Sequence, residues 1–449
     1  MRSLLLIGLV FSLIPLVFMK PHIGVLLWGW ISYMNPHRLT FGLAYSLPFL
    51  DFVFLATMIG LLISKEPKRI PSTPVVWLLG GYLAWVTFTT VFSLNTDPDQ
   101  SSWIQISWDK WVLFLKIQLF TFLSLILLTT KGRIMALVAI IALSIGFFGA
   151  KGGVFTILGG GENRVWGPPG SFFGDNNHLA LALITAAPLA WFFAMHAPHR
   201  LLRLGALVLV PLILIAALGT YSRGAVVGMS AMLLFLILRS RHRFLSLGVA
   251  ALIGVLALMF MPQQWHERIS TIQEYEEDMS AQQRLSAWRY AFAVANSRPI
   301  GGGFTVFYHQ PTLDRFRAGD EKTHNAHSVY FEILGEHGYF GLFLFFWLAT
   351  TAFFTASKVM RLARGRPDLL WARDLAALAQ VSMVGFGTSG AFLNLGTFDL
   401  YYHVIAIIVI VHQVVVKQLA AEPQAQAAKA QPAGGLSQAP PPTRGSLAK

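Results

Sequence analysis

Residues that could bind phosphate occur in short polar segments between long apolar runs. Residues 220–224, Thr-Tyr-Ser-Arg-Gly, form a tight predicted turn between two such runs. Ser222 could cap the helix that follows, and Arg223 stands at its start, where the helix dipole disfavours a cation. A helix N-terminus beside an arginine fork binds phosphate well. The alternative is an arginine that only snorkels to lipid headgroups. We favour the phosphate site, because misplaced charge beside an apolar span is usually functional.

A second polar segment, Arg-Leu-Ser-Ala-Trp-Arg at 284–289, precedes the glycine-rich turn 299–304. Arg284 and Trp288 are four residues apart and share one helix face, whereas Arg284 and Arg289 do not. Two interpretations remain open. The segment could be an amphipathic interface helix with its tryptophan at the lipid headgroups. Alternatively, Arg284 faces a phosphate while Trp288 packs the helix down or stacks on a sugar.

A third segment, Thr-His-Asn-Ala-His-Ser at 323–328, is predicted to open a helix, so that His324 and His327 share a face. Zinc would need further ligands, but Glu332 and Glu336 would lie about 140° and about 180° round the helix from His327. Three protein ligands are the usual minimum for catalytic zinc, so we predict no metal. The histidine is either a general base beside a basic site or a structural group.

A fourth, weaker feature is the glycine- and amide-rich stretch 159–178, which contains Arg164 and Asn177. Such a loop could admit a polar ligand, or it could be an ordinary flexible connection.

The elements that position these segments are predicted from composition. Hydrophobic residues make up 55% of the 449 residues and charged residues only 12%, against about 25% in soluble domains. Lipid is therefore the expected solvent. Continuous apolar runs such as 204–218 and 342–354 favour helices over barrel strands, which would alternate. Cysteine is absent from the sequence, which excludes disulfides and thiolate catalysis. We thus predict an all-α, polytopic membrane protein.

About 12 membrane-spanning helices are predicted, with 22–34 as a short extra or re-entrant segment. The predicted spans are 3–19, 41–63, 75–92, 110–129, 134–149, 178–195, 203–219, 224–238, 244–261, 328–357, 374–392 and 400–417. Lysines and arginines concentrate in every second connection, and the positive-inside rule places those connections in the cytoplasm. The connections 93–109, 150–177, 220–223, 262–326 and 393–399 would then be external, so all four polar segments lie on the external face. The net charge of +13 follows this topology rather than a nucleic-acid surface.

The domain organisation follows from these spans. Residues 1–261 are the N-terminal and central transmembrane helices, and 262–326 form a larger periplasmic loop domain. Residues 327–419 are the C-terminal transmembrane helices. Residues 420–449, rich in Ala, Gln, Pro and Gly, are predicted to be a disordered cytoplasmic tail.

These motifs, in this order, resemble the O-antigen ligase and O-antigen polymerase superfamily over roughly residues 130–415. The similarity rests on the 222–224 turn, on Arg284, Trp288 and the 299–301 stretch, and on a His pattern. That pattern is a His followed by Asn, Ser or Gln, nine residues and Gly-x-x-Gly. It fits His327 with Gly338, and also His324 with Gly335; the position of Glu336 favours His327. Residues 34–38 resemble a subgroup described as O-glycosylation ligases.

The resemblance implies transfer of a glycan from undecaprenyl pyrophosphate to an acceptor hydroxyl, most often of lipid A-core, on the periplasmic side of the bacterial inner membrane. The residues suit this reaction: Arg223 and Arg284 could clamp the pyrophosphate, and a neutral His327 could take the acceptor proton. Attack opposite the leaving group would invert the anomeric centre, and no cofactor or metal is required if arginine supplies the positive charge. The expected substrate-binding residues are Arg289, Trp288, His324, Asn325, Ser222, Arg164 and Asn177. The expected partners are the lipid-linked donor, the acceptor and membrane lipids, with no nucleic acid.

Other functions remain open at this stage. A polymerase would use a second lipid-linked glycan as acceptor, and a protein O-oligosaccharyltransferase would use a protein. A transporter of lipid-linked sugars would need charges along the membrane interior and repeat symmetry. The predicted spans carry few charges and the sequence shows no such symmetry.

Overall fold

The computed structural model describes residues 1–95, 101–240, 242–270, 279–316 and 325–430. Within these residues all regular secondary structure is helical, as the sequence predicts. Ten of the described helices are long and apolar enough to cross a membrane. The chain is therefore a multi-pass membrane protein.

The bounds of the helices follow in chain order. They are α1 (Arg2–Met19), α2 (His22–Met34), α3 (Leu43–Ser46), α4 (Phe49–Ile63), α5 (Pro74–Val91), α6 (Ser101–Leu127), α7 (Lys131–Leu158), α8 (Asn176–His196), α9 (Arg200–Gly219), α10 (Arg223–Arg239), α11 (Arg243–Phe260), α12 (Gln263–Ser270), α13 (Met279–Ser297), α14 (Gln310–Phe316), α15 (Val329–Leu362), α16 (Leu370–Gly390) and α17 (Asp399–Ala430), with 3-10 turns η1 (Pro36–Leu39), η3 (Val306–Tyr308) and η4 (Pro367–Leu369).

The prediction of about 12 spans differs from the ten long helices at two places. The segment predicted at 41–63 forms α3 and the 15-residue α4, and the segment at 224–238 forms the 17-residue α10. At about 1.5 Å per residue these two helices are shorter than the roughly 30 Å hydrocarbon core. The extra segment 22–34 is α2, a helix of 13 residues, most of them buried.

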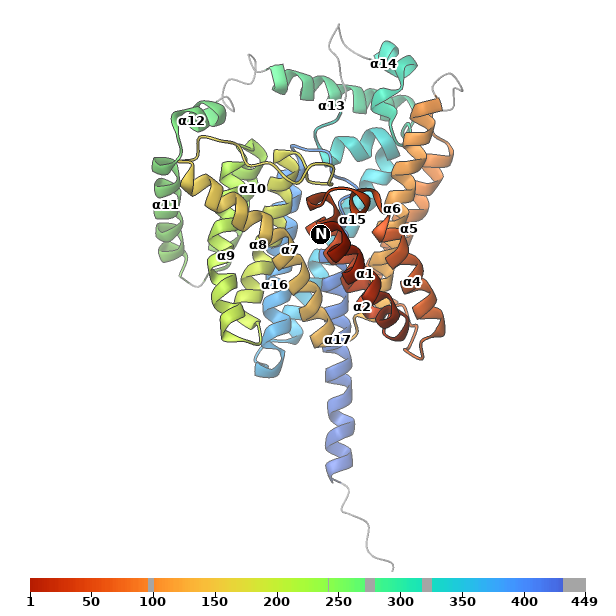
Figure 1. Ribbon diagram of the computed structural model, residues 1–449, viewed down its shortest axis with the longest axis vertical. Coiled ribbons are helices and arrows are strands. Elements are labelled where there is room, and N and C mark those ends of the chain that lie inside the picture. The colour runs from red at the N-terminus through yellow and green to blue at the C-terminus, as the bar shows by residue number, and fades with distance from the viewer. Residues whose placement is uncertain (96–100, 241, 271–278, 317–324, 431–449) are drawn as a thin grey trace, which may run out of the picture.

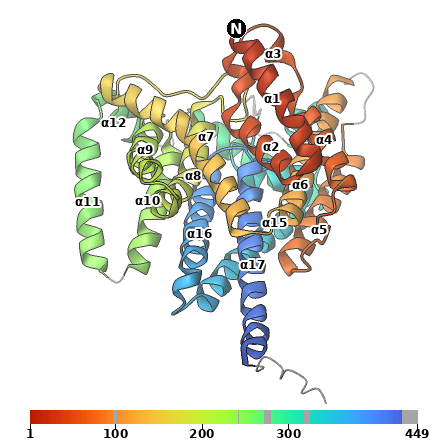
Figure 2. The same cartoon turned by 60° about the horizontal axis from the view of Figure 1, so that its bottom comes forward.

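The helices form a bundle with two different ends (Figure 1). Helices α12, α13 and α14 lie across one end, here called the α13 end, and α17 projects from the other, the α17 end. Helix α11 stands at the edge in both views (Figures 1 and 2), and only 7% of its apolar window is buried, against 83% for α8. Helix α8 packs against α7, α9 and α16, so it lies inside the bundle.

Local sequence explains where several of these helices begin. Thr73, Thr130, Asp175 and Ser222 each accept a hydrogen bond from a backbone N–H in the first turn of the helix that follows. Each satisfies a donor that the helix itself leaves unpaired. The cap at Ser222 was predicted from the sequence, and it fixes the N-terminus of α10 at the α13 end.

Helix α15 is broken at Gly338, where φ is +69°. The residues before and after the break pack on the glycine-rich turn that follows α13. Tyr339 N–H donates to the Pro299 carbonyl (3.2 Å), so the Gly335 carbonyl is free to accept from Gly302 N–H (2.9 Å). The sequence predicts Gly338 as a helix-packing glycine within one helix. That prediction was wrong in part, because the residue adopts a left-handed conformation and divides the helix.

This break predicts a strong effect of Gly338→Ala. A Cβ atom there would lie 1.9 Å from the Pro299 carbonyl oxygen, and the left-handed conformation alone costs about 1–2 kcal/mol. We expect a lower midpoint of thermal unfolding in detergent. Gly80→Ala is the control, because its Cβ would meet nothing within 4 Å. Equal midpoints for the two variants would contradict the break.

The connection between α11 and α15 contains α12, α13, η3 and α14 in its described part. Within this connection the residue patterns of 265–278 and 282–295 each predict a helix, and the second is confirmed as α13. The helix predicted to start at Trp265 is α12, whereas residues 271–278 lie outside the described residues. Helix α17 continues beyond Leu419 to Ala430, so the predicted tail begins as helix, and residues 431–449 lie outside the description.

Candidate functional site

Three segments meet at the α13 end of the bundle, beginning with the turn that leads into α10. Tyr221 has φ +59°, and the Ser222 hydroxyl accepts a hydrogen bond from Ala225 N–H (3.3 Å). Arg223 is the first residue of α10 and only 9% exposed. A buried arginine therefore stands at a helix start, and helix starts favour anions.

The second segment is the start of α8, which is tied to that turn. The Asn176 amide donates to the Thr220 carbonyl (2.7 Å), and Asp175 accepts from Asn177 N–H (2.8 Å) as the helix cap. The same turn of α8 carries His178. The predicted binding residue Asn177 therefore lies in the first turn of a helix beside the Arg223 turn.

The third segment is the loop 325–328, which carries His327. The helix begins at Val329 with Ser328 as its N-cap residue, and His327 has φ +46°. The prediction that His327 belongs to the helix was wrong, so the argument placing His324 and His327 on one helical face does not apply. The left-handed conformation turns the chain before the helix begins, as a non-glycine residue rarely does, and such strain clusters at functional sites.

Burial lowers the pKa of the His327 imidazole, and the positive charge of Arg284 lowers it further. His178 also lowers the pKa of His327, whereas Asp175 raises it. These four side chains, from α8, α13 and the loop before α15, therefore lie near enough to interact electrostatically. A lowered pKa keeps the ring neutral at pH 7, as a general base must be.

Two side chains hold the His327 loop in place. The Trp288 indole donates to the Ala326 carbonyl (2.9 Å) and stacks on Phe331, with ring centroids 4.6 Å apart. The Tyr308 hydroxyl donates to the Asn325 amide oxygen (2.9 Å). Phe331 therefore covers one face of the Trp288 ring, and Trp288 ties α13, which carries Arg284, to the loop that carries His327.

Two further predicted site residues, Arg289 and Arg164, are exposed at the surface. Arg289 is exposed on α13. Arg164 is exposed too, with its guanidinium carbon 5.6 Å from the centroid of the Tyr221 ring. His324 lies outside the described residues. The structure thus brings His327 and Arg284 together, with the Arg223 turn tied to the neighbouring start of α8.

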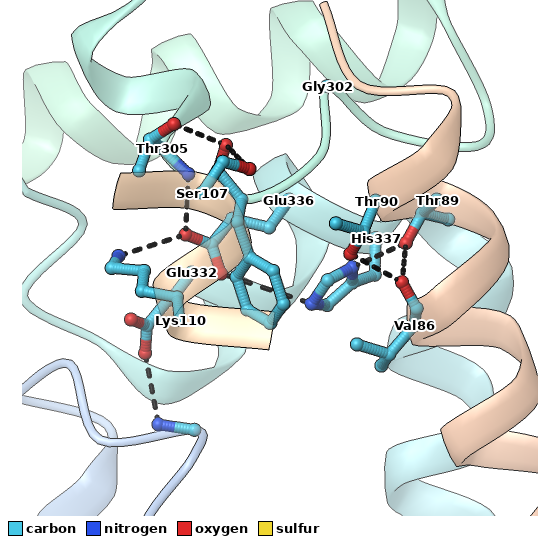
Figure 3. Close-up of polar contacts among 12 residues, drawn as sticks. Val86, Thr89, Thr90, Ser107, Lys110, Gly302, Thr305, Glu332, Glu336 and His337 are labelled. Atoms are coloured by element: carbon cyan, nitrogen blue, oxygen red, sulfur yellow. Dashed lines mark hydrogen bonds and ion pairs between the residues drawn. The ribbon is translucent and has the colours of Figure 1, made fainter. Parts of the chain in front are cut away.

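A buried charged cluster on α15 was not predicted as part of the site (Figure 3). Glu336 is 3% exposed; its Oε1 lies 3.5 Å from Lys110 Nζ and accepts from Thr305 N–H (3.3 Å). His337 Nδ1 lies 2.7 Å from the Thr89 hydroxyl. Glu332 accepts from Gly396 N–H (3.0 Å). One cluster therefore connects α5, α6, α15 and two loops.

The cavity among these side chains has a volume of only ≈ 10 Å³. That space holds about one water molecule and no sugar. The cluster therefore holds the first part of α15, and with it the His327 loop, rather than binding substrate. Its sequence signal was two glutamates, one turn apart, in an otherwise apolar helix. The sequence alone gives these glutamates no role in a buried ion-pair cluster.

Metal ligation finds no support in the described part of the chain. No group of three or more His, Cys, Asp or Glu side chains there could hold a metal ion. The positive charge near His327 comes instead from Arg284.

Two regions of the chain match known families. Residues 207–346 match the O-antigen ligase family. The matched stretch runs from α9 to the first part of α15 and includes Arg223, Arg284 and His327. The chain belongs to the O-antigen ligase superfamily. Residues 1–198 match a second family, whose function is unknown, and no curated protein matches the chain.

Membership in the O-antigen ligase superfamily indicates a glycosyltransferase-type enzyme of ligase or polymerase type, which acts in the assembly of lipopolysaccharide or another glycan. Its partners are, in general terms, a lipid-linked glycan and an acceptor. Asp175 and His178 fall within the second match, so both matched regions contribute side chains near His327.

Proposed function

We propose that this O-antigen ligase homologue transfers a glycan from undecaprenyl pyrophosphate to a hydroxyl of lipid A-core. The observation that carries the proposal is the grouping of His327 and Arg284 beside the capped, arginine-bearing start of α10. An enzyme that breaks a bond to pyrophosphate needs positive charge where the leaving group forms, and a neutral base near the attacking hydroxyl.

The reaction is a displacement at the anomeric carbon. The acceptor oxygen forms a bond to that carbon while the bond to the pyrophosphate oxygen breaks, and the electron pair leaves with the pyrophosphate. The hydroxyl proton passes to the neutral imidazole of His327. Arg223 and Arg284 bind the growing negative charge, since guanidinium stays protonated and grips phosphate with two N–H groups. Attack opposite the leaving group inverts the anomeric centre.

The orientation of the chain follows from its charges. Lysines and arginines gather at the α17 end, for example in the α15–α16 connection and in the first turn of α9. The positive-inside rule assigns that end to the cytoplasm of a bacterial inner membrane and the α13 end to the periplasm.

Two alternative acceptors, a second lipid-linked glycan or a protein hydroxyl, would use the same clamp and base. A transporter would instead require charges along the bundle interior. The cluster around Glu336 is charged and buried, but its cavity of ≈ 10 Å³ is closed to a glycan. A transferase is therefore favoured.

The test is to incubate the purified protein with undecaprenyl-pyrophosphate-linked glycan and, in separate reactions, lipid A-core, a second lipid-linked glycan or a protein acceptor. A covalent product with lipid A-core is expected, and movement of the donor without any product would indicate transport.

We also expect transfer to continue in excess EDTA, because arginines supply the positive charge. A requirement for divalent ions that persists with metal-free donor would contradict the arginine mechanism.

A further inference from the structure

A groove of ≈ 400 Å³ lies between α7 and residues 164–169, where α7 reaches the α13 end. Its walls include the aromatic rings of Phe148, Phe155 and Trp166, and its cations are Lys151 and Arg164. The volume is within the range of ligand pockets, about 300–1,000 Å³. An apolar wall with two cations fits an amphiphile that carries negative charge.

The two cations lack the carboxylates that neutralise others in this chain. Arg133 pairs with Glu66 (2.7 Å), and Lys116 pairs with Asp51. Among the residues that the structure describes, no carboxylate lies within 4 Å of the Lys151 or Arg164 side-chain nitrogens. The residues that line the groove thus include two cations and no carboxylate, so an anionic ligand could bind there.

The position of Lys151 along α7 places the charge at a membrane boundary. Lys151 lies 151 − 131 = 20 residues after Lys131, the first residue of α7. At about 1.5 Å per residue this is about 30 Å, the thickness of the hydrocarbon core. Leu143 and Phe147 precede Lys151 at four-residue intervals, so they share its helix face, and both are more than 40% exposed. A lipid whose phosphate met Lys151 could lay its chains along this face.

Two hydrogen bonds connect the groove to the turn before Arg223. Val165 N–H donates to the Gly219 carbonyl (2.9 Å), and the Tyr221 hydroxyl donates to the Gly161 carbonyl (2.6 Å). The loop that carries Arg164 is thus attached to the turn that leads directly into Arg223. A lipid held in the groove would stand beside the site assigned to the donor pyrophosphate.

We propose that this groove binds the phosphate of the lipid acceptor, with the acyl chains along α7 and the phosphate between Lys151 and Arg164. The inference rests on the proposed transfer and gives the acceptor a site separate from the donor clamp. The acceptor is therefore a phosphorylated glycolipid, and phosphate is one feature by which the protein selects it.

The test compares Lys151→Ala/Arg164→Ala with the wild type in nanodiscs, using lipid A-core and the same lipid after phosphatase treatment. We expect the double variant to bind lipid A-core about tenfold or more weakly, because two charge-assisted contacts are lost. Its KM for the acceptor should rise while kcat and donor binding stay unchanged. Dephosphorylated acceptor should bind wild type and variant equally weakly. Lys65→Ala/Arg200→Ala, which removes two exposed cations, one in the α4–α5 connection and one at the first residue of α9, is the matched control.

Wild-type affinity for lipid A-core in the groove variant would overturn the proposal. Equal loss of both acceptors would also overturn it, because the groove would then not recognise phosphate. Competition by phosphatidylglycerol as strong as that by lipid A-core would identify a general site for anionic lipid instead of an acceptor site. If the wild type bound the acceptor in a phosphate-dependent way but transferred no glycan, the groove proposal would hold and the proposed transfer would fail. Failure of the groove and failure of the proposed function are therefore distinguishable.

Discussion

His327→Ala should lower the turnover number about 10²–10⁴-fold, the usual cost of removing a general base. The donor should still bind, because Arg223 and Arg284 remain. The measurements are single-turnover transfer and binding of the lipid-linked donor. His199→Ala is the control, since His199 is exposed before α9. If His327→Ala lost donor binding as completely as turnover, the residue would be a pyrophosphate ligand or a structural support.

The pH profile tests the same residue. Burial and Arg284 lower the pKa of His327, so the neutral ring should persist below pH ~6.5, the ordinary value for histidine. The rate should therefore stay high in mildly acidic buffer and fall only as the pH drops through the lowered pKa. Arg284→Ala removes a positive charge, so the acid limb of its residual activity should move to higher pH. An acid limb that did not move would show that Arg284 does not act on the base.

The His324→Ala variant tests which of the two histidines is the base. The sequence pattern fits both histidines, and His324 lies outside the described residues. We expect His324→Ala to be milder than His327→Ala, because the structure places His327 near Arg284 and His178. An inactive His324→Ala beside an active His327→Ala would assign the base to His324.

The fold could be predicted from the sequence where the apolar runs are long. Ten apolar runs gave ten long helices, and Ser222 gave the α10 cap. Two predicted spans are not among the ten long helices. Part of the run 41–63 forms the short helix α3 and a turn before α4, and the run 224–238 forms α10, which has 17 residues. The break at Gly338 was missed, since a Gly-x-x-Gly pattern suits helix packing and a left-handed bend equally well.

The roles of the candidate site residues stay predictions, but their positions can be compared with the sequence. The sequence predicts that Arg284 and His327 act together, and the structure places them near enough to interact electrostatically. The contributions of His178 and Lys110 were not predicted, because they come from α8 and α6, far from the motif in sequence. Contacts between helices depend on how the bundle packs, and local spacing carries no information about it.

Arg223→Ala and Arg284→Ala should each raise the activation free energy by about 2.7–4 kcal/mol, as loss of one oxyanion donor does. Both should remain folded, which thermal unfolding in detergent would check. Lysine should restore little activity at either position, because an ammonium lacks the planar fork that binds phosphate with two N–H groups.

Comparison with Arg289→Ala tests whether Arg284 acts as a directed phosphate clamp. Arg289 is exposed and five residues from Arg284, so the two do not share a helix face. Its loss should therefore cost less than the loss of Arg284, and mainly in substrate affinity. Donor-analogue binding and kcat/KM should be measured for Arg223→Ala, Arg284→Ala and Arg289→Ala together. Full activity of Arg223→Ala or Arg284→Ala would remove that residue from the mechanism. Equal losses for Arg284 and Arg289 would indicate diffuse attraction by a basic surface, because only a directed clamp depends on which face of α13 carries the charge.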